Sequence, residues 1–228
     1  MREICLDTET TGFDPKNGHK IVEIGCVELF NKLPTGKTFH RYLNPQRDVP
    51  QEVVNVHGLT AEFLKDKPLF KDVANDFLKF IRDDPLVIHN AAFDMRFLNA
   101  EFAWINYGVI PMTRSIDTLS MAKQKFPGSP ASLDALCKRF DIDLSTRSLH
   151  GALLDSQLLA SVYLELCGGR QTIMTWEAGG QKRSQEDLMR ERPYKPARAF
   201  PLTDEEISRH EEMMLRLKNP IWKEIKAS

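Results

Sequence analysis

The segment that decides the fold of this chain is the apolar run ICLDTETTG at residues 4–12, which carries two acidic side chains. Asp7 and Glu9 stand two residues apart, and this spacing places both carboxylates on the same face of a β-strand. Two like charges held this close are costly unless a positive charge lies between them. A divalent ion such as Mg²⁺ or Mn²⁺ would supply that charge. On this pair alone, a metal site and a strand with a solvated polar face are equally good interpretations.

The composition is that of a globular protein with a full hydrophobic core. Of the 228 residues, 42% are hydrophobic and 28% are charged, which predicts one α/β domain plus an appendage. The formal net charge of −1 gives no overall basic surface of the kind that coats duplex nucleic acid. Nucleic acid stays open as a substrate, because bound metal ions would add positive charge that the sequence count omits.

The cysteines and the start of the chain predict a cytoplasmic location. The widely spaced cysteines form no Cys-x-x-Cys pair, so we expect buried free thiols at Cys5, Cys26, Cys137 and Cys167. Met1 stands directly before the strand that carries the acids, which leaves no room for a signal peptide. The most apolar helix, near residues 152–167, is interrupted by Asp155 and Glu165, so we expect no transmembrane span.

Strand and helix patterns alternate along the first 170 residues and predict an α/β fold, with a mixed five-stranded sheet covered by helices on both faces. Short turns between the first three strands favour antiparallel hairpins. The expected elements are strands at 2–8, 20–30 and 36–43, a helix at 68–82, a strand at 86–88, a helix from the N-cap Asn90 to about Tyr107, a strand at 113–118, and helices at 119–126, 132–140 and 151–167.

The composition changes after Gly168-Gly169, which we expect to end the last helix of a domain at residues 1–170. Residues 171–199 carry many charges and few apolar side chains, and we expect them to form a flexible linker. Thr203 and Glu206 form a capping-box pattern that predicts a helix over 203–218. Such a helix needs a partner surface for its apolar stripe of Ile207, Met214, Leu215 and Leu217.

Two further acids interrupt the apolar faces of helices. Asp94 falls on the inward face of its helix with Phe97, and Asp155 falls on the inward face of the last helix with Leu158. A buried carboxylate requires a partner or a metal ion. A position near a helix N-terminus or a pairing with arginine would explain one of the two acids. It is a poor explanation of both acids together with Asp7 and Glu9.

His150 precedes Gly151 at the start of the last helix, which predicts a loop position from which the ring can reach the acids. Histidine exchanges a proton near neutral pH, so beside four acids a general base is a better interpretation than a capping or solvated histidine. Four carboxylates and one base suit hydrolysis of a phosphodiester with two metal ions. The sequence contains neither a Gly-x-Ser-x-Gly elbow nor a phosphate-binding loop of the Walker type.

These residues carry a family resemblance. Asp7-x-Glu9, Asp94 and His150-x-x-x-x-Asp155 resemble the signature of the DEDDh exonucleases, a branch of the ribonuclease H-like superfamily. Within that branch the chain is most similar to the epsilon family of proofreading subunits of bacterial DNA polymerase III. This similarity spans residues 1 to about 170 and is carried by the segments 7–12, 56–59, 89–94 and 149–155.

The resemblance implies a 3′→5′ exonuclease that releases nucleoside monophosphates from a DNA 3′ end with two divalent cations, Mg²⁺ or Mn²⁺. Asp7, Glu9 and Asp155 would hold one ion, Asp7 would also hold the second with help from Asp94 through water, and His150 would be the general base. The substrate-binding residues that the resemblance implies are Asp7, Glu9, Thr10, Gly12, Glu52, His57, Asn90 and Asp155.

The resemblance also implies partners within a replicative polymerase. Residues 171–176 are similar to the peptide that binds the sliding clamp, with Gln171, Met174 and Trp176 as the contacting side chains. Residues 200–228 would bind the polymerase (alpha) subunit, and a small theta-like subunit is a third candidate partner. No membrane partner is expected.

Two other hypotheses stay open. A free-standing DEDDh enzyme that trims RNA would use the same chemistry, although such enzymes lack a long tail of this kind. A non-catalytic adaptor between clamp and polymerase would not need the complete set of acids and His150.

Overall fold

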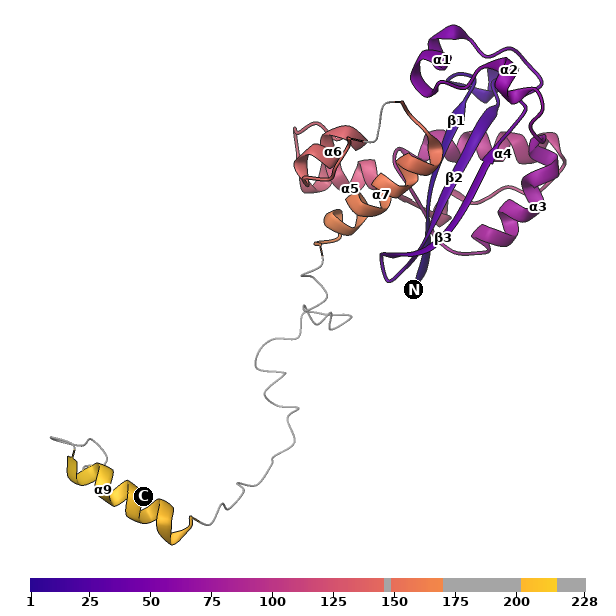
Figure 1. Ribbon diagram of the computed structural model, residues 1–228. Coiled ribbons are helices and arrows are strands. Elements are labelled where there is room, and N and C mark those ends of the chain that lie inside the picture. Colours follow the sequence, from indigo (N-terminus) through magenta and orange to yellow (C-terminus); the bar gives the residue numbers. More distant parts are fainter. Residues whose placement is uncertain (146–148, 170–201, 217–228) are drawn as a thin grey trace. The chain divides into compact units, whose positions relative to one another are not determined.

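The structure is a computed structural model that describes residues 1–145, 149–169 and 202–216 (Figure 1). The chain divides into two units, Met1–Trp176 and Glu177–Ser228, and each is described by itself. The described strands are β1 (Arg2–Thr10), β2 (Ile21–Phe30), β3 (Leu33–Tyr42), β4 (Leu86–Ile88) and β5 (Ser115–Asp117). The described helices of the first unit are α1 (Gln51–His57), α2 (Ala61–Leu64), α3 (Phe70–Ile81), α4 (Ala91–Trp104), α5 (Thr118–Lys125), α6 (Leu133–Arg139) and α7 (Ala152–Leu166), with 3₁₀ turns at Pro15–Asn17 and Met112–Arg114.

The strands form one mixed sheet in the order β3-β2-β1-β4-β5. Strands β1, β2 and β3 pair antiparallel, with Cys5 opposite Val27 and Val27 opposite Thr38. Strand β4 is parallel to β1, and β5 is parallel to β4. Parallel pairing requires crossover connections, and helices occupy the connections that lead to β4 and β5. The expected five-stranded α/β sheet is confirmed.

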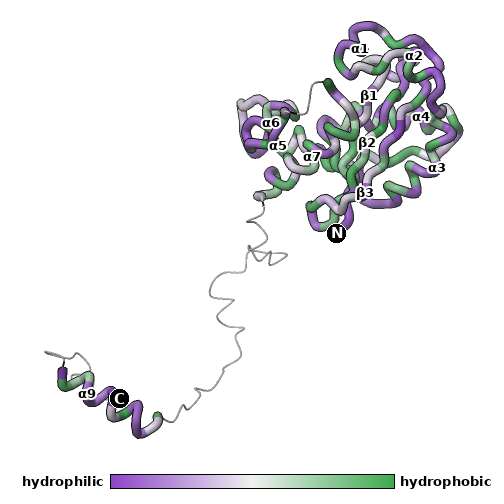
Figure 2. The backbone as a smooth tube through the Cα atoms, viewed as in Figure 1, coloured by the Kyte–Doolittle hydropathy of each residue, from purple (hydrophilic) through white to green (hydrophobic). Residues whose placement is uncertain are grey.

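Alternation along β1 directs successive side chains to the two faces of the sheet. Ile4 and Leu6 join the core under α3 and α4, whereas Cys5 joins the core under α7. Figure 1 shows these helices around the sheet, and Figure 2 shows hydrophobic residues along β1 and β2 where the helices cover them. The expected cover of helices on both faces is therefore confirmed.

An aromatic cluster fixes α4 on its face of the sheet. Phe77, Phe97 and Phe102 are fully buried, and the rings of Phe70 and Phe102 meet edge to face with their centroids 5.1 Å apart. Each buried ring contributes about 1.5–3 kcal/mol relative to an exposed one. This layer therefore holds α4, and with it Asp94, in a fixed position on the sheet.

Helix α7 crosses β2 in direct main-chain contact at Gly25. A Cβ atom at Gly25 would lie 2.2–2.3 Å from main-chain atoms of Ala152 and Leu153. One turn further along α7, Ser156 Oγ donates a 2.9 Å hydrogen bond to the carbonyl oxygen of Gly25. Because Gly25 is the register partner of Asp7, this contact brings the first turn of α7 beside the strand that carries the acids.

The start of α4 differs from the prediction. Asn90 occupies the N-cap position, but its backbone is left-handed (φ 66°) and its side chain makes no capping hydrogen bond. Asp117 at the end of β5 supplies the cap, because its Oδ1 accepts from the main-chain N–H groups of Asn90 (3.0 Å) and Ala91 (3.4 Å). The capping group therefore comes from another strand, which local sequence patterns do not indicate.

The sequence pattern does not predict α1 and α2. Helix α1 follows Pro50 without a side-chain cap and ends at Gly58 (φ 76°). Helix α2 has only four residues. Neither helix is long enough to show an apolar period. Helix α1 nevertheless carries two residues of the candidate site, Glu52 and His57.

The second unit contains α9 (Asp204–Arg216) among its described residues. The expected capping box is present: Glu206 Oε2 accepts from the N–H of Thr203 at 2.9 Å, and Thr203 Oγ1 accepts from the N–H of Glu206 at 3.3 Å. Figure 2 shows hydrophobic and hydrophilic residues alternating along this helix. The proposed linker at 171–199, including the clamp-binding peptide, and residues 217–228 lie outside the described part of the chain.

The thiols agree with the prediction except at Cys167. Cys5, Cys26 and Cys137 are buried and outside any disulfide, as predicted, whereas Cys167, also outside any disulfide, is only partly buried. In the part of the chain that the structure describes, every helix is too short or too polar to cross a membrane.

Replacing Gly25 with alanine should destabilise the nuclease unit. The added methyl group would meet main-chain atoms of α7, which cannot rotate away, so the loss should reach at least the 1–3 kcal/mol, roughly, that overpacked cores show. Calorimetry should report a melting temperature lower by about 2–4 °C per kcal/mol. Gly108→Ala is the control, because a Cβ there meets nothing within 4 Å. An unchanged melting temperature for Gly25→Ala would contradict the close contact.

Candidate active site

The first two acids lie at the end of β1, on the face of the sheet that α7 covers. Asp7 is paired with Gly25, and the pairing register shifts between Glu9 and Thr10. A β-bulge ends regular pairing and changes the direction of the side chains that follow it. Asp7 and Glu9 both precede the shift, so the regular alternation of the strand places their carboxylates on one face, as the sequence predicts.

The third acid and the histidine come from the start of α7. Asp155 is buried in the first turn, and His150 lies on the loop before the helix with 47% of its side chain exposed. The His150 ring nitrogen Nδ1 lies 3.1 Å from Asp155 Oδ2, and the His150 main-chain N–H donates to the carbonyl oxygen of Val56 at 3.1 Å. Ligand atoms of Glu9, His150 and Asp155 lie within 4.8 Å of one another.

The fourth acid, Asp94, lies in the first turn of α4 and is buried. Its Oδ1 accepts two hydrogen bonds from Thr8, one from the main-chain N–H at 3.1 Å and one from Oγ1 at 2.7 Å. Burial raises the pKa of Asp94 to about 7, although the hydrogen bonds from Thr8 oppose the rise. Thr8 thus connects the acid of α4 to the strand between Asp7 and Glu9.

The four carboxylates repel one another. Burial raises the pKa of Asp7 well above its ordinary value, and the charges of Asp94, Glu9, Asp155 and Glu23 raise it further, in that order of size. An arrangement of buried oxygen ligands with this excess of negative charge is stabilised by divalent cations. Asp7, Glu9, Asp94 and Asp155 therefore fit the metal site that the sequence predicts.

The loop after β1 is held rigidly. Thr10 Oγ1 donates a 2.6 Å hydrogen bond to the carbonyl oxygen of Gly12, and Thr11 Oγ1 lies 3.2 Å from Nδ1 of His19. A Cβ at Gly12 would lie 2.3–2.6 Å from the His19 ring, so only glycine permits this close packing. The two predicted substrate residues of this loop, Thr10 and Gly12, therefore have fixed positions.

Helix α1 supplies the other two residues that the resemblance assigned to the terminal nucleotide. His57 is buried and Glu52 is exposed. The Nδ1 atom of His57 accepts a 3.0 Å hydrogen bond from the N–H of Leu59. Burial lowers the pKa of His57; the main-chain carbonyl of Thr10, which accepts from the ring, opposes this effect, and the charge of the neighbouring His150 adds to it. His57 is therefore neutral at physiological pH.

An open cleft of about 560 Å³ joins several of the predicted residues. Asp7, Asn90, His150 and Asp155 line it together with residues of α5 and the α5–α6 loop. The predicted residues that do not line this cleft are Glu9, Thr10, Gly12, Glu52, His57 and Asp94. Gln171, Met174 and Trp176 lie outside the described residues.

Sequence reasoning missed three residues that shape the site. Gly25 lacks the Cβ atom that would separate α7 from β2, and Asp117 caps α4. His89 lines the cleft, and its Nδ1 lies 3.0 Å from Thr118 Oγ1. His89 directly follows β4 and Asp117 ends β5, and these two strands run parallel to each other. Polar residues at the ends of adjacent parallel strands meet at one edge of the sheet, and this pattern was the available signal.

Replacing Asp94 with asparagine should stabilise the metal-free protein increasingly as the pH rises. In the folded protein Asp94 keeps its proton up to about pH 7, whereas in the unfolded chain it ionises near its ordinary value of 3.8. The folded state therefore loses stability as the pH rises from about 4 to about 7, and asparagine avoids that loss. Thermal melts in EDTA should show a difference between variant and wild type that grows over this range. A difference independent of pH would contradict the assignment.

Comparisons with known proteins agree with this geometry. A family model described as exonuclease matches residues 4–163. The DNA polymerase III subunit epsilon of Rickettsia prowazekii is 60% identical over 175 residues, which cover 75% of this chain and 76% of that protein. The same subunit of Escherichia coli is 48% identical over 222 residues, which cover 92% of this chain and 90% of that protein.

Solved structures share the fold. Exonuclease X in complex with 5′ overhanging duplex DNA has a TM-score of 0.58 at 26% identity and covers 72% of this chain and 90% of that one. The nuclease domain of 3′hExo, a DEDDh family member bound to rAMP, has a TM-score of 0.63 at 19% identity and covers 73% of this chain and 91% of that one. The chain therefore belongs to the exonuclease family and, within it, to the epsilon subunits of DNA polymerase III.

Proposed function

We propose that this metal-dependent 3′→5′ exonuclease proofreads DNA within a replicative polymerase by removing single nucleotides from the 3′ end as monophosphates. The observation that carries the proposal is the meeting of Glu9, His150 and Asp155 within 4.8 Å of one another, together with Asp7, whose pKa is raised by desolvation and by the neighbouring acids. Acids from β1 and α7 converge with a histidine at one end of the sheet, and this combination suits hydrolysis of a phosphodiester.

The proposed cofactors are two divalent cations, Mg²⁺ or Mn²⁺. Asp7, Glu9 and Asp155 would hold one ion, and Asp7 would hold the second with help from Asp94 through water. Both hydrogen bonds from Thr8 end on Oδ1 of Asp94, so Oδ2 remains for a ligand water. When bound, the ions activate a water molecule and neutralise the leaving oxygen of the phosphodiester.

His150 acts as the general base in this proposal. Its Nδ1 faces Oδ2 of Asp155 at 3.1 Å, which favours the tautomer that leaves Nε2 to accept a proton. With 47% of its side chain exposed, the ring can turn toward the water that attacks the phosphorus. The bond to the 3′ oxygen of the remaining strand then breaks, and the terminal nucleotide leaves with its 5′ phosphate.

The terminal nucleotide is held by Thr10, Gly12, Glu52 and His57 on one side of the acids, and Asn90 contacts the substrate from the cleft. The rigid loop at 10–12 and the neutral ring of His57 suit binding by shape and stacking rather than by base code. Selectivity for a mismatch follows from fraying, because a mispaired end costs less free energy to unstack.

The two alternatives have weaker support. A free-standing RNA-trimming enzyme does not account for residues beyond 170, whereas the E. coli epsilon subunit matches this chain over 92% of its length. A non-catalytic adaptor does not account for four acids and a histidine at one end of the sheet. Proofreading is therefore the function that the geometry supports best.

We propose further that the tail tethers the nuclease. Gln171, Met174 and Trp176 bind the sliding clamp, 200–228 bind the polymerase subunit, and a small theta-like subunit is a candidate partner of the nuclease unit. The exposed side chains of α9, such as Leu215 at 82%, support a partner for the second segment.

The purified chain should release deoxynucleoside monophosphates from a mismatched DNA primer faster than from a paired primer or a short RNA. Asp7→Asn should abolish release, because the carboxylate shared by both ions is lost. His150→Gln should lower kcat by about 10²–10⁴-fold, as removal of a general base does. Gel or chromatographic analysis of single-turnover products measures each rate.

Thermal melts with Mn²⁺ are the control for this experiment. The ion should raise the melting temperature of wild type and of His150→Gln, and it should do so far less for Asp7→Asn. Strong preference for RNA, or full activity of Asp7→Asn, would contradict the proposed function.

Replacing Gln171, Met174 and Trp176 together with alanine in the full-length chain should abolish co-elution with the sliding clamp in size-exclusion chromatography. Hydrolysis of free primers should be unchanged, because the proposed nuclease site is built from residues 7–155 and includes none of these three side chains. Unchanged clamp binding would show that residues 171–176 are not the attachment point.

A further inference from the structure

The cleft beside the acids has a second wall that the proposed function leaves unused. Helix α5 and the α5–α6 loop form this wall, and its residues are Leu119, Lys123, Ser129, Ala131, Ser132 and Leu133. The same cleft is also lined by Asp7, His150 and Asp155. Among the residues that line the cleft, Lys123 is the one lysine or arginine. The wall therefore places one positive charge in the same cleft as the reacting centre.

The two lysines of α5 differ in their contacts. Lys125 Nζ donates to the carbonyl oxygens of Glu165 (3.1 Å) and Leu166 (2.9 Å) at the end of α7. Lys123 is exposed and forms no hydrogen bond or ion pair with any of the residues that the structure describes. Lys123 stands four residues after Leu119, so both side chains lie on the side of α5 that faces the cleft. Lys125 thus has a structural contact, and Lys123 is available for a ligand.

His89 and Ser132 hold the wall in place. The His89 ring lies at the end of β4, with Nδ1 3.0 Å from Thr118 Oγ1 and a backbone hydrogen bond to Ala131. Ser132 Oγ accepts a 3.2 Å hydrogen bond from the N–H of Ala135 as the N-cap of α6. In this hydrogen bond Ser132 Oγ is the acceptor, so the hydroxyl hydrogen of Ser132 is still available for donation to a ligand in the cleft.

The position of the wall indicates which part of the substrate it meets. Of the residues that the proposed function assigns to the terminal nucleotide, Asp7, Asn90 and Asp155 line this cleft, whereas Glu9, Thr10, Gly12, Glu52 and His57 do not. The terminal nucleoside and the rest of the strand leave the scissile phosphate in opposite directions. The cleft therefore receives the strand on the 5′ side of the scissile bond, where the next phosphate meets no metal ion.

We propose that Lys123 binds the phosphate that follows the scissile phosphate in the 5′ direction, and that Ser129 and Ser132 donate hydrogen bonds to the same stretch of backbone. This inference rests on the proposed function, because it needs a DNA strand in the cleft. Lys123 is the one lysine or arginine among the residues that line this cleft, so it is the side chain there with a permanent positive charge for a phosphate. It recognises any sequence, since a phosphate contact carries no base information.

The test compares two substrates of the full-length protein. One is a single-stranded DNA oligonucleotide, and the other is the p-nitrophenyl ester of thymidine 5′-monophosphate, which has a scissile phosphate but no further phosphate. Lys123→Glu and Lys123→Ala should raise KM for the oligonucleotide by about tenfold, as loss of a charge-assisted hydrogen bond does. The KM for the aryl ester should change less than twofold.

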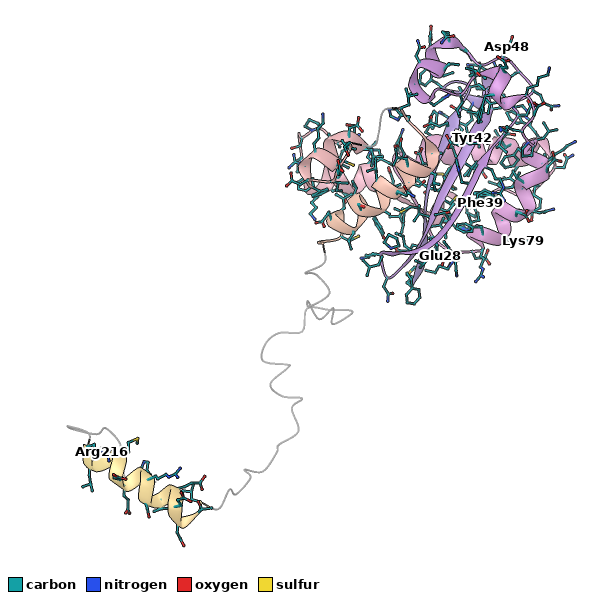
Figure 3. All side chains as sticks on the ribbon, viewed as in Figure 1. Glu28, Phe39, Tyr42, Asp48, Lys79 and Arg216 are labelled. Carbon is teal, nitrogen blue, oxygen red and sulfur yellow. The ribbon has the colours of Figure 1, made fainter. Side chains whose placement is uncertain are left out.

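Salt dependence gives a second readout that a purely structural role would not move. The slope of log(kcat/KM) for the oligonucleotide against log[salt] should fall in magnitude by about 0.7 in Lys123→Ala, the amount expected for one contact with single-stranded DNA. Lys123→Arg should restore most of the affinity, because the charge is kept. Lys79→Glu is the matched control: it makes the same change in net charge at an exposed lysine of α3 (Figure 3) that does not line the cleft.

Three results would overturn the inference. Equal losses on both substrates would mean that Lys123 acts on the reacting centre itself. Equal effects of Lys79→Glu and Lys123→Glu would mean that only net charge matters. No effect of Lys123→Glu on the oligonucleotide would mean that the lysine is merely solvated. Failure of the wild-type protein on both substrates with Mg²⁺ and Mn²⁺ would instead contradict the proposed function.

Discussion

Repulsion between closely placed carboxylates, two of them buried, is the interaction on which the rest of this structure depends. The charges of Asp94, Glu9 and Asp155 raise the pKa of Asp7. A fold that holds such groups together loses stability unless a bound cation offsets their repulsion. The core has to supply that stability in advance. The aromatic layer under α4 and the main-chain contact of α7 at Gly25 hold the acids against their mutual repulsion, so the site is preorganised for cations.

The fold was largely predictable because its strong signals are local. The apolar run around Asp7, the short turns between the first strands and the helical spacing after residue 68 each depend on neighbouring residues, and each gave the correct element. The inward positions of Asp94 and Asp155 were predictable for the same reason, since an acid within an apolar stripe contradicts the pattern around it. The placement of His150 on the loop before α7 followed from the glycine beside it.

The remaining features depend on residues distant in the sequence. The cap of α4 is Asp117, which lies 27 residues after Asn90 and on a different strand. Glycine is needed at position 25 because the main chain of Ala152 lies against it. The residues next to Gly25 in the sequence do not indicate that contact. Helices α1 and α2 are too short to carry a period of their own. Sequence patterns thus located the acids, whereas packing between elements determined how closely they approach.

The two ends of α7 are fastened to different parts of the nuclease unit. Near its start, Ser156 Oγ donates a hydrogen bond to the carbonyl oxygen of Gly25. Near its end, the Tyr163 hydroxyl donates to Glu3 at 2.8 Å, and Lys125 binds the last carbonyl groups. A force applied to the chain beyond α7 would therefore load the contacts of Lys125 and Tyr163 before it reached Asp155.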